Sequence, residues 1–243
     1  MSQILKITDL KGGYKEEVNI LCGISLEVKQ GEAVGIIGLN GSGKSTFGKA
    51  IMNMIPYRRG EFVFEGEDIT SLTTSQLSQR GISIMQQGGR VFKNLSVWDN
   101  LQLALSRQSS NNLDKLKDII PMLQQSKKDL QRTMADKLSG GQKHQLSLAM
   151  TLASNPRLVI LDEPSAGLSP KAVEEMYKMM QSARDMLGIT TVLIEQNVSY
   201  AIKFCEVCVM ISSGKITQSF RGDILNMSEI ESLMYKLYRN EQD

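Results

Sequence analysis

The chain has 243 residues, of which 41% are hydrophobic and 22% are charged, as in an ordinary folded protein. Its 28 Lys and Arg residues nearly balance its 26 Asp and Glu residues, so its charge gives no reason to expect nucleic acid as the main ligand. Three cysteines are too few for a disulfide scaffold in a chain of this length. No stretch reaches the roughly 18 apolar residues of a membrane span, and the first residues lack a signal-peptide core. We therefore expect a cytosolic protein with reduced thiols.

The first third of the chain predicts strands, then a glycine-rich loop and a helix. Residues 4–10 and 20–28 alternate between apolar and polar side chains, which favours strands. A short apolar run at 32–37 ends in a glycine-rich loop, and 44–55 is typical of a helix. Residues 61–64 predict another strand. These early strands indicate an antiparallel layer beside the first buried strand.

The rest of the chain alternates between helical and strand patterns. Residues 111–132 predict helices that break near Pro121, because proline cannot continue a helix from within. The later elements are expected as a helix from 140 to about 153, strands at 158–161, 190–194 and 207–211, a helix from Ser169–Pro170, and a short amphipathic helix at 228–238. Strands that alternate with helices favour βαβ units and a mostly parallel sheet.

A phosphate-binding loop follows the first buried strand. Residues 38–45 read Gly-Leu-Asn-Gly-Ser-Gly-Lys-Ser, which matches the pattern G-x-x-x-x-G-K-[ST]. Glycines let the backbone turn its N–H groups towards anionic oxygens, and the next helix adds its N-terminal dipole. Lys44 would neutralise the β- and γ-phosphates, and Ser45 would offer its hydroxyl to Mg²⁺. The predicted nucleotide-binding residues of this loop are Gly38, Asn40, Gly41, Ser42, Gly43, Lys44, Ser45 and Thr46.

Two carboxylates follow the apolar run at 158–161. Ligands of open α/β sheets bind at the carboxyl ends of strands, so Asp162 and Glu163 are candidates for the site. Asp162 would hold Mg²⁺ through water, and Glu163 would act as general base on an attacking water. Taken alone, this pattern is equally typical of a surface strand end. Behind a phosphate loop, it predicts nucleotide hydrolysis.

With residues 138–142, which read Leu-Ser-Gly-Gly-Gln, the chain resembles the nucleotide-binding subunit of an ABC transporter. The resemblance covers about 14–222. It implies an α/β fold: a P-loop NTPase (RecA-like) core with a mostly parallel sheet, an antiparallel β layer and an inserted helical subdomain that carries the signature motif. It further implies a single nucleotide-binding domain over 1–243, with the helical subdomain at about 88–155 and a short C-terminal helix at about 223–243.

The resemblance also implies a head-to-tail dimer. Each ATP would lie between the phosphate loop of one subunit and the signature of the other. The signature residues Ser139, Gly140, Gly141 and Gln142 would form a second anion cradle at a helix start. Ser139 would also cap that helix, and the two roles are compatible. The implied cofactors are ATP and Mg²⁺.

Further site residues follow from the resemblance. Tyr14 matches an aromatic that stacks on adenine, although it could be a surface tyrosine. Gln87 matches the glutamine that contacts Mg²⁺ and the attacking water, with Gln86 as its rival because the usual preceding proline is absent. The metal ligands would then be Ser45, Gln87 and Asp162. Phe92 and Trp98 lie where a transmembrane partner would bind, with core packing as the alternative.

Two departures from the family pattern are informative. Gln196 occupies the position of the usual switch histidine, and the single histidine, His144, lies just after the signature and cannot replace it. The catalytic residues are then Glu163, Gln87 and Gln196. Ser169 occupies the position of a common aspartate. With a glutamine at this position, the chain resembles the ATP-binding subunits of branched-chain amino-acid importers. The subunits of urea-type importers are similar. So is the lipopolysaccharide-export ATPase, although it usually keeps a histidine at this position.

The expected function is therefore an ATP-hydrolysing subunit that energises uptake of a small polar solute, with branched-chain amino acids as first candidate. Its expected partners are separate transmembrane permease subunits, a second ATP-binding subunit, identical or paralogous, and an external solute-binding protein, with no nucleic acid. It would lie at the cytoplasmic face of the cell membrane. The alternatives are the urea-type and lipopolysaccharide-export types, a soluble ABC-type ATPase for cofactor assembly, and a regulatory module without turnover.

One further motif is the C-x-x-C spacing of Cys205 and Cys208. On a strand, two residues three apart point to opposite faces, which argues against a shared zinc or redox site.

Overall fold

The computed structural model describes residues 2–16, 18–105, 112–221, 228–229, 231–232 and 234–235. The chain forms two compact units. The first, here called the phosphate-loop unit, comprises Met1–Gln79 and Thr190–Asp243. The second, the signature unit, comprises Arg80–Ile189. The C-terminal helix expected at 223–243 lies mostly outside the described residues.

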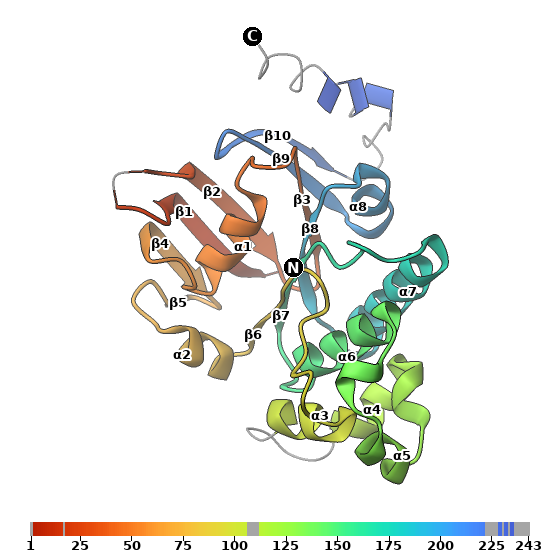
Figure 1. Ribbon diagram of the computed structural model, residues 1–243. Coiled ribbons are helices and arrows are strands. Elements are labelled where there is room, and N and C mark those ends of the chain that lie inside the picture. The colour runs from red at the N-terminus through yellow and green to blue at the C-terminus, as the bar shows by residue number, and fades with distance from the viewer. Residues whose placement is uncertain are drawn as a thin grey trace. The chain divides into compact units, whose positions relative to one another are not determined.

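An antiparallel sheet forms one layer of the phosphate-loop unit (Figure 1). Its strand order is β2-β1-β4-β5, and the strands are β1 (Gln3–Gly13), β2 (Leu21–Lys29), β4 (Tyr57–Phe64) and β5 (Glu67–Asp68). Buried and exposed residues alternate over 24–29 in β2, as they should where one face of a sheet packs on a core and the other meets water. In β1, register shifts interrupt the alternation. A short helix, α2 (Thr74–Gln79), follows the sheet. The antiparallel layer expected from the sequence is confirmed.

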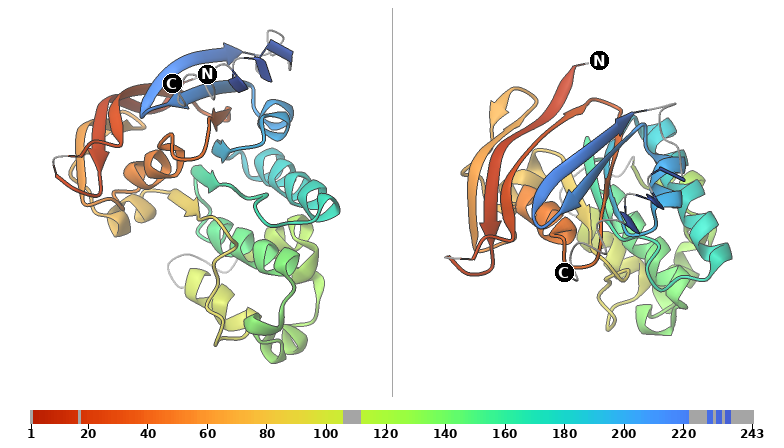
Figure 2. Two further views of the ribbon diagram at one scale, coloured as in Figure 1. Left: turned by 45° about the horizontal axis from the view of Figure 1, so that its top comes forward. Right: turned by 90° about the horizontal axis from the view of Figure 1, so that it is seen from above.

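The other layer of this unit is built on β3 (Ala33–Ile37), in which every residue is buried. Strand β3 runs parallel to both β8 (Thr190–Glu195) and β9 (Val207–Ser212). The last strand, β10 (Lys215–Arg221), is antiparallel to β9. Helices α1 (Lys44–Ile51) and α8 (Val198–Phe204) lie on opposite sides of these strands, with α1 on the side of the antiparallel sheet (Figure 2).

Helix α1 ends at Ile51, four residues before the expected end, and Arg58 explains how its last turn is held. The Arg58 guanidinium donates to the carbonyl oxygens of Ala50 and Thr70, both at 2.6 Å, and lies 4.2 Å from the centre of the Phe62 ring. Burial lowers the pKa of Arg58 to about 10. A positive charge at a helix C-terminus is favourable because it complements the helix dipole. Arg58 therefore anchors α1 to the antiparallel sheet.

The expectation that Cys205 and Cys208 point to opposite faces is wrong. Cys205 precedes β9 and is the C-cap that follows α8, so the two cysteines do not share one strand. Both Sγ atoms lie within 3.2 Å of the point that a Cβ on Gly35 would occupy. Neither forms a disulfide, and the described residues contain no group of three metal-ligating side chains. The two thiols fill the space above Gly35.

The signature unit contains two parallel strands, β6 (Ile82–Met85) and β7 (Leu158–Asp162). All of β7 is buried, as expected for an apolar parallel strand. Helix α7 (Pro170–Leu187) follows it, and Ser169 caps its first turn by accepting from the N–H of Ala172. The serine that replaces the expected aspartate therefore keeps a residue type that favours helix starts.

The remainder of this unit is helical, and its elements are α3 (Val97–Leu105), α4 (Asn112–Ile119), η1 (Pro121–Gln124), α5 (Lys127–Arg132), η2 (Ala135–Lys137) and α6 (Gly140–Leu152). The break expected at Pro121 is confirmed, and a second break precedes α5, which Ser126 caps. Helix α3 packs against α5 and α6. Among the described residues, the helices are all too short or too polar to cross a bilayer.

Candidate nucleotide-binding and hydrolysis site

The predicted site residues divide between the two units. The phosphate-loop unit holds Tyr14, the loop at 38–46 and Gln196. The signature unit holds Gln87, the signature at 139–142, Asp162 and Glu163. In each unit, these residues lie at strand ends, at helix starts or in the loops beside them.

The phosphate loop joins the end of β3 to the start of α1 and is largely buried. Lys44 is only 4% exposed, and its Nζ donates to the carbonyl oxygens of Gly38 at 2.9 Å and Leu39 at 2.8 Å. Gly43, the N-cap of α1, has φ +104, a conformation that glycine adopts without strain. The loop backbone thus surrounds the Lys44 side chain, and two carbonyl oxygens of the same loop hold its ammonium group.

Ser42 adds a polar atom without a partner inside the loop. Its Oγ is buried and makes no hydrogen bond to any described residue. Buried hydroxyls are normally paired, so an orphaned one in a glycine-rich loop points to a ligand with hydrogen-bonding oxygens. Asn40 and Gly41 are exposed, Ser45 is half-buried and Thr46 is buried at the start of α1. The loop therefore has the donor chemistry that a polyphosphate needs.

Tyr14 lies just after β1, in a tight hairpin that returns to β2. The tyrosine is 47% exposed. The returning arm packs on the phosphate loop, because a Cβ on Gly43 would lie 3.4 Å from the carbonyl oxygen of Ile20. An exposed aromatic side chain thus comes from a connection whose returning arm contacts the phosphate loop beside α1.

Gln196 follows the last residue of β8. The register pairs Ile37 of β3 with Glu195 of β8, so Gln196 and Gly38 leave the sheet at the same edge from neighbouring strands. Gln196 is exposed, whereas Glu195 is 1% exposed. The next residue, Asn197, caps α8 by accepting from the N–H of Ser199 at 3.0 Å.

Glu163 and Gln87 meet in the signature unit. Gln87 Nε2 donates to Glu163 Oε2 at 2.5 Å, and β6 and β7 bring the two residues together because Met85 pairs with Leu161. Of the two rival glutamines, Gln87 is the one that makes this contact. Glu163 has φ +47, which is uncommon for a residue with a side chain and occurs often at functional sites. Asp162, one residue earlier, is 2% exposed.

The signature forms the start of α6. Ser139 accepts from the N–H of Gln142 at 3.3 Å, and Gln142 Oε1 accepts from the N–H of Ser139 at 3.0 Å, a complete capping box. The expected capping role of Ser139 is confirmed. Ser139 and Gly140 are exposed, and a Cβ on Gly140 would meet no atom within 4 Å. The helix start is therefore ordered and open to an incoming anion.

His144 contacts the loop after Gln87, which was not predicted from the sequence. His144 is 5% exposed, and its Nδ1 lies 3.0 Å from the carbonyl oxygen of Gly140. A Cβ on Gly89, which has φ +58, would lie 2.9 Å from that nitrogen. The consecutive glycines 88 and 89 were the available signal, since glycine permits such a close approach. The Gln87 loop and the signature helix are thus in direct contact.

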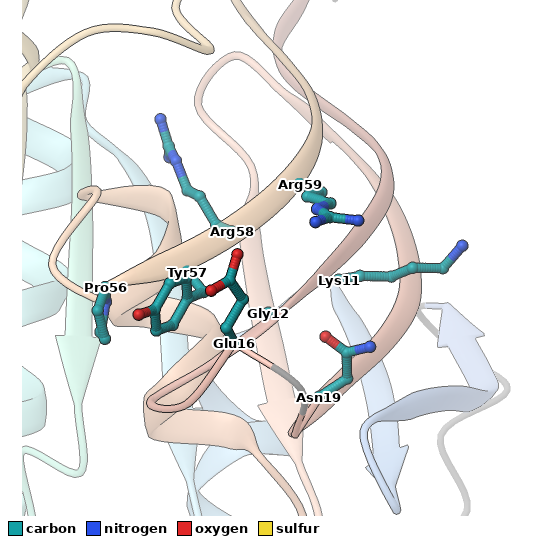
Figure 3. A pocket seen from close by; sticks show the side chains of 8 residues that line it. All are labelled: Lys11, Gly12, Glu16, Asn19, Pro56, Tyr57, Arg58 and Arg59. Atoms are coloured by element: carbon teal, nitrogen blue, oxygen red, sulfur yellow. The ribbon is translucent and has the colours of Figure 1, made fainter.

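A separate pocket of about 270 Å³ lies at the end of the antiparallel sheet. Figure 3 shows that its side chains come from β1, the hairpin after it and the start of β4, and they are Lys11, Glu16, Asn19, Pro56, Tyr57, Arg58 and Arg59, beside Gly12. None of the predicted nucleotide-binding residues lines it. We assign it no part in nucleotide binding.

The chain is similar to known proteins over most of its length. A family model described as ABC transporter matches residues 21–166. The branched-chain amino acid transport ATP-binding protein BraG of Pseudomonas aeruginosa is 31% identical over 87% of this chain and 91% of its own. The lipopolysaccharide export ATP-binding protein LptB of Haemophilus influenzae is 30% identical over 98% of both. The ADP conformation of MJ1267, an ATP-binding cassette of an ABC transporter, superposes with a TM-score of 0.78 at 26% identity over 98% of this chain and 99% of its own.

Proposed function

This chain belongs to the ABC transporter family of ATPases, and we propose that it powers the uptake of a small polar solute through separate transmembrane subunits. Branched-chain amino acids are the first candidate substrate class, because BraG carries that function in its name. The glutamine at 196 supports an importer of this type. The observation that carries the ATPase assignment is the buried phosphate loop, with Lys44 directed at it and the hydroxyl of Ser42 unpartnered within it.

ATP would bind with its phosphates in the loop at 38–46. The N–H groups at the start of α1 and the Lys44 ammonium would then contact the β- and γ-phosphates, as charge-assisted hydrogen bonds. Tyr14 would stack on adenine from the hairpin, since an exposed ring offers its face to a base. Ser45, Gln87 and Asp162 carry the oxygen donors that Mg²⁺ prefers, and this ion supplies charge neutralisation at the phosphates when bound.

Hydrolysis would use Glu163 as the general base. Its carboxylate would take a proton from water while the water oxygen forms a bond to the γ-phosphorus and the bond to the β-phosphate oxygen breaks, giving ADP and phosphate. Gln87 is hydrogen-bonded to this carboxylate and would orient both it and the water. Gln196 would donate its amide N–H groups to the γ-phosphate, without taking up a proton.

A second subunit would complete each site. The start of α6 is open at Gly140, and a helix N-terminus with an open surface can bind a phosphate. We therefore propose a head-to-tail dimer in which Ser139, Gly140, Gly141 and Gln142 contact the ATP of the partner subunit. The other partners would be transmembrane permease subunits and an external solute-binding protein, with this chain at the cytoplasmic face of the membrane.

Lipopolysaccharide export is the second candidate. It is favoured by the similarity to LptB, which extends over 98% of both chains. Purification from native membranes in mild detergent separates the two candidates. Permease subunits together with a solute-binding protein would support uptake, whereas a lipopolysaccharide-binding membrane complex would support export. Recovery of soluble partners alone would contradict the transporter assignment.

The substitution Glu163→Gln tests the hydrolytic assignment. It removes the base and keeps side-chain size, so we expect ATP affinity within about threefold of wild type and a kcat at least about 100-fold lower, the range attributed to general-base catalysis. Glu174→Gln is the matched control, because Glu174 is an exposed residue of α7 in the same unit. If Glu163→Gln kept a tenth or more of the wild-type kcat, Glu163 would not be the base.

A further inference from the structure

Asn100 is a fully buried polar side chain that contacts an exposed segment. It lies in α3 and is 0% exposed. Its Oδ1 accepts from the N–H of Phe92 at 2.8 Å, and its Nδ2 donates to the carbonyl oxygens of Phe92 at 3.0 Å and Ser96 at 2.9 Å. The Phe92 side chain, in contrast, is 55% exposed. One buried amide thus fixes both ends of the segment 92–96.

The same segment is paired with the residues that lead into the signature. The N–H of Val97 donates to the carbonyl oxygen of Thr133 at 2.8 Å, and the N–H of Ala135 donates to that of Leu95 at 3.0 Å. Ser96 and Met134 form the antiparallel bridge between these bonds. A two-stranded ladder therefore joins 93–97 to 133–136, and Ser139 follows three residues later.

Buried hydrogen bonds of this kind make a segment rigid. A buried amide that loses its partners carries a desolvation cost, so Asn100 resists any displacement of Phe92 that does not move α3 as well. The ladder transmits the same constraint to 133–136. We therefore expect the Phe92 ring, the Asn100 amide and residues 133–136 to move together as a rigid unit.

We propose that Asn100 is a positioning residue that couples the exposed segment around Phe92 to the signature. A displacement of Phe92 would then move the residues that lead into Ser139 rather than bend the segment. This inference rests on the proposed role of the signature in hydrolysis. It adds to that role a residue that would touch neither nucleotide nor partner.

The first measurement is amide hydrogen exchange on the full chain. In Asn100→Ala, we expect the N–H of Phe92 to exchange at least about tenfold faster, as the loss of one hydrogen bond allows, and that of Ala135 to follow. Leu101→Ala is the matched control, because Leu101 is equally buried in α3 and has an apolar side chain. It should lower Tm and leave both amides protected. Unchanged exchange in Asn100→Ala would overturn the proposal.

The second measurement is ATP hydrolysis by the same variants. Asn100→Ala should lower kcat several-fold at unchanged ATP affinity, whereas Leu101→Ala at a similar loss of Tm should keep kcat. Equal losses of kcat in the two variants would assign Asn100 a structural role only. Should Asn100→Ala fail to fold, Asn100→Ser serves instead, because serine is uncharged and too short to keep the bonds that the amide makes to Phe92.

Failure of the proposed function would look different. If Ser139→Ala left kcat unchanged, the signature would have no part in hydrolysis, while the exchange results for Asn100 would still stand. If Ser139→Ala lowered kcat and Asn100→Ala did not, the signature role would hold and the coupling through Asn100 would be wrong.

Discussion

The phosphate loop and the signature both end in a helix start that we propose to contact phosphate, but the chain builds them differently. In the phosphate loop, Lys44 and Ser42 are at most 5% exposed, and the backbone encloses them. In the signature, Ser139 and Gly140 are exposed, and a capping box orders the turn. The enclosed loop can hold a ligand by itself. The open helix start can only add contacts to a ligand that something else brings.

The largest expected effect comes from the enclosed loop. Lys44→Ala removes the ammonium group, so we expect the ATP dissociation constant to rise at least about 100-fold, the equivalent of one or two charge-assisted hydrogen bonds. Lys49→Ala is the control, because Lys49 lies in the last turn of the same helix. Calorimetric titration with ATP measures both. An affinity within threefold of wild type would mean that the loop binds phosphate without its lysine.

A smaller effect is expected at the signature. Ser139→Ala breaks the capping box and should lower kcat about tenfold while ATP affinity stays unchanged. Ser126→Ala is a close control, since Ser126 caps α5 in the same unit by accepting from the N–H of Asp129. Each substitution should cost about 1 kcal/mol of unfolding free energy, as loss of a cap does. Steady-state ATPase assays beside thermal unfolding separate the two. A weaker ATP affinity in Ser139→Ala would contradict the contrast between the two helix starts.

The smallest effect concerns pH. Gln196 does not titrate, so we expect the kcat of the wild type to vary less than about threefold between pH 6 and 8. Gln196→His should introduce a pH dependence with an apparent pKa near 6.5, the ordinary value for histidine. Gln196→Asn is the non-titrating control. A steep pH profile in the wild type would show that another group, and not residue 196, controls turnover in this range.

Much of the fold could be predicted from the sequence because local patterns decide it. The alternation at 24–28 in β2, the apolar run of β7 and the break at Pro121 all appear as expected. Short elements gave weaker signals. Strand β6 has four residues and helix α8 has seven, too few for a period to show, and neither was predicted.

The residues of the candidate site could be predicted from the sequence, but the contacts between their side chains could not. Motif spacing identifies Lys44, Glu163 and the signature, because their chemistry requires fixed residue types at fixed distances along the chain. The choice between Gln86 and Gln87 depends on which side chain reaches Glu163 from a neighbouring strand, and adjacent residues of one loop give no signal for that. The approach of His144 to Gly89 has the same origin, since only the fold brings these two residues together.

The backbone of Glu163 has a consequence for protein engineering. At φ +47, a side chain lies in the left-handed region, where glycine, asparagine and aspartate are tolerated and branched residues are not. A variant at position 163 would therefore have to meet two requirements. Its side chain must support hydrolysis, and its backbone must tolerate a positive φ. Valine, isoleucine and threonine variants would be lost to strain before their catalysis could be judged. Any search for altered hydrolysis should vary the surrounding loop together with the residue.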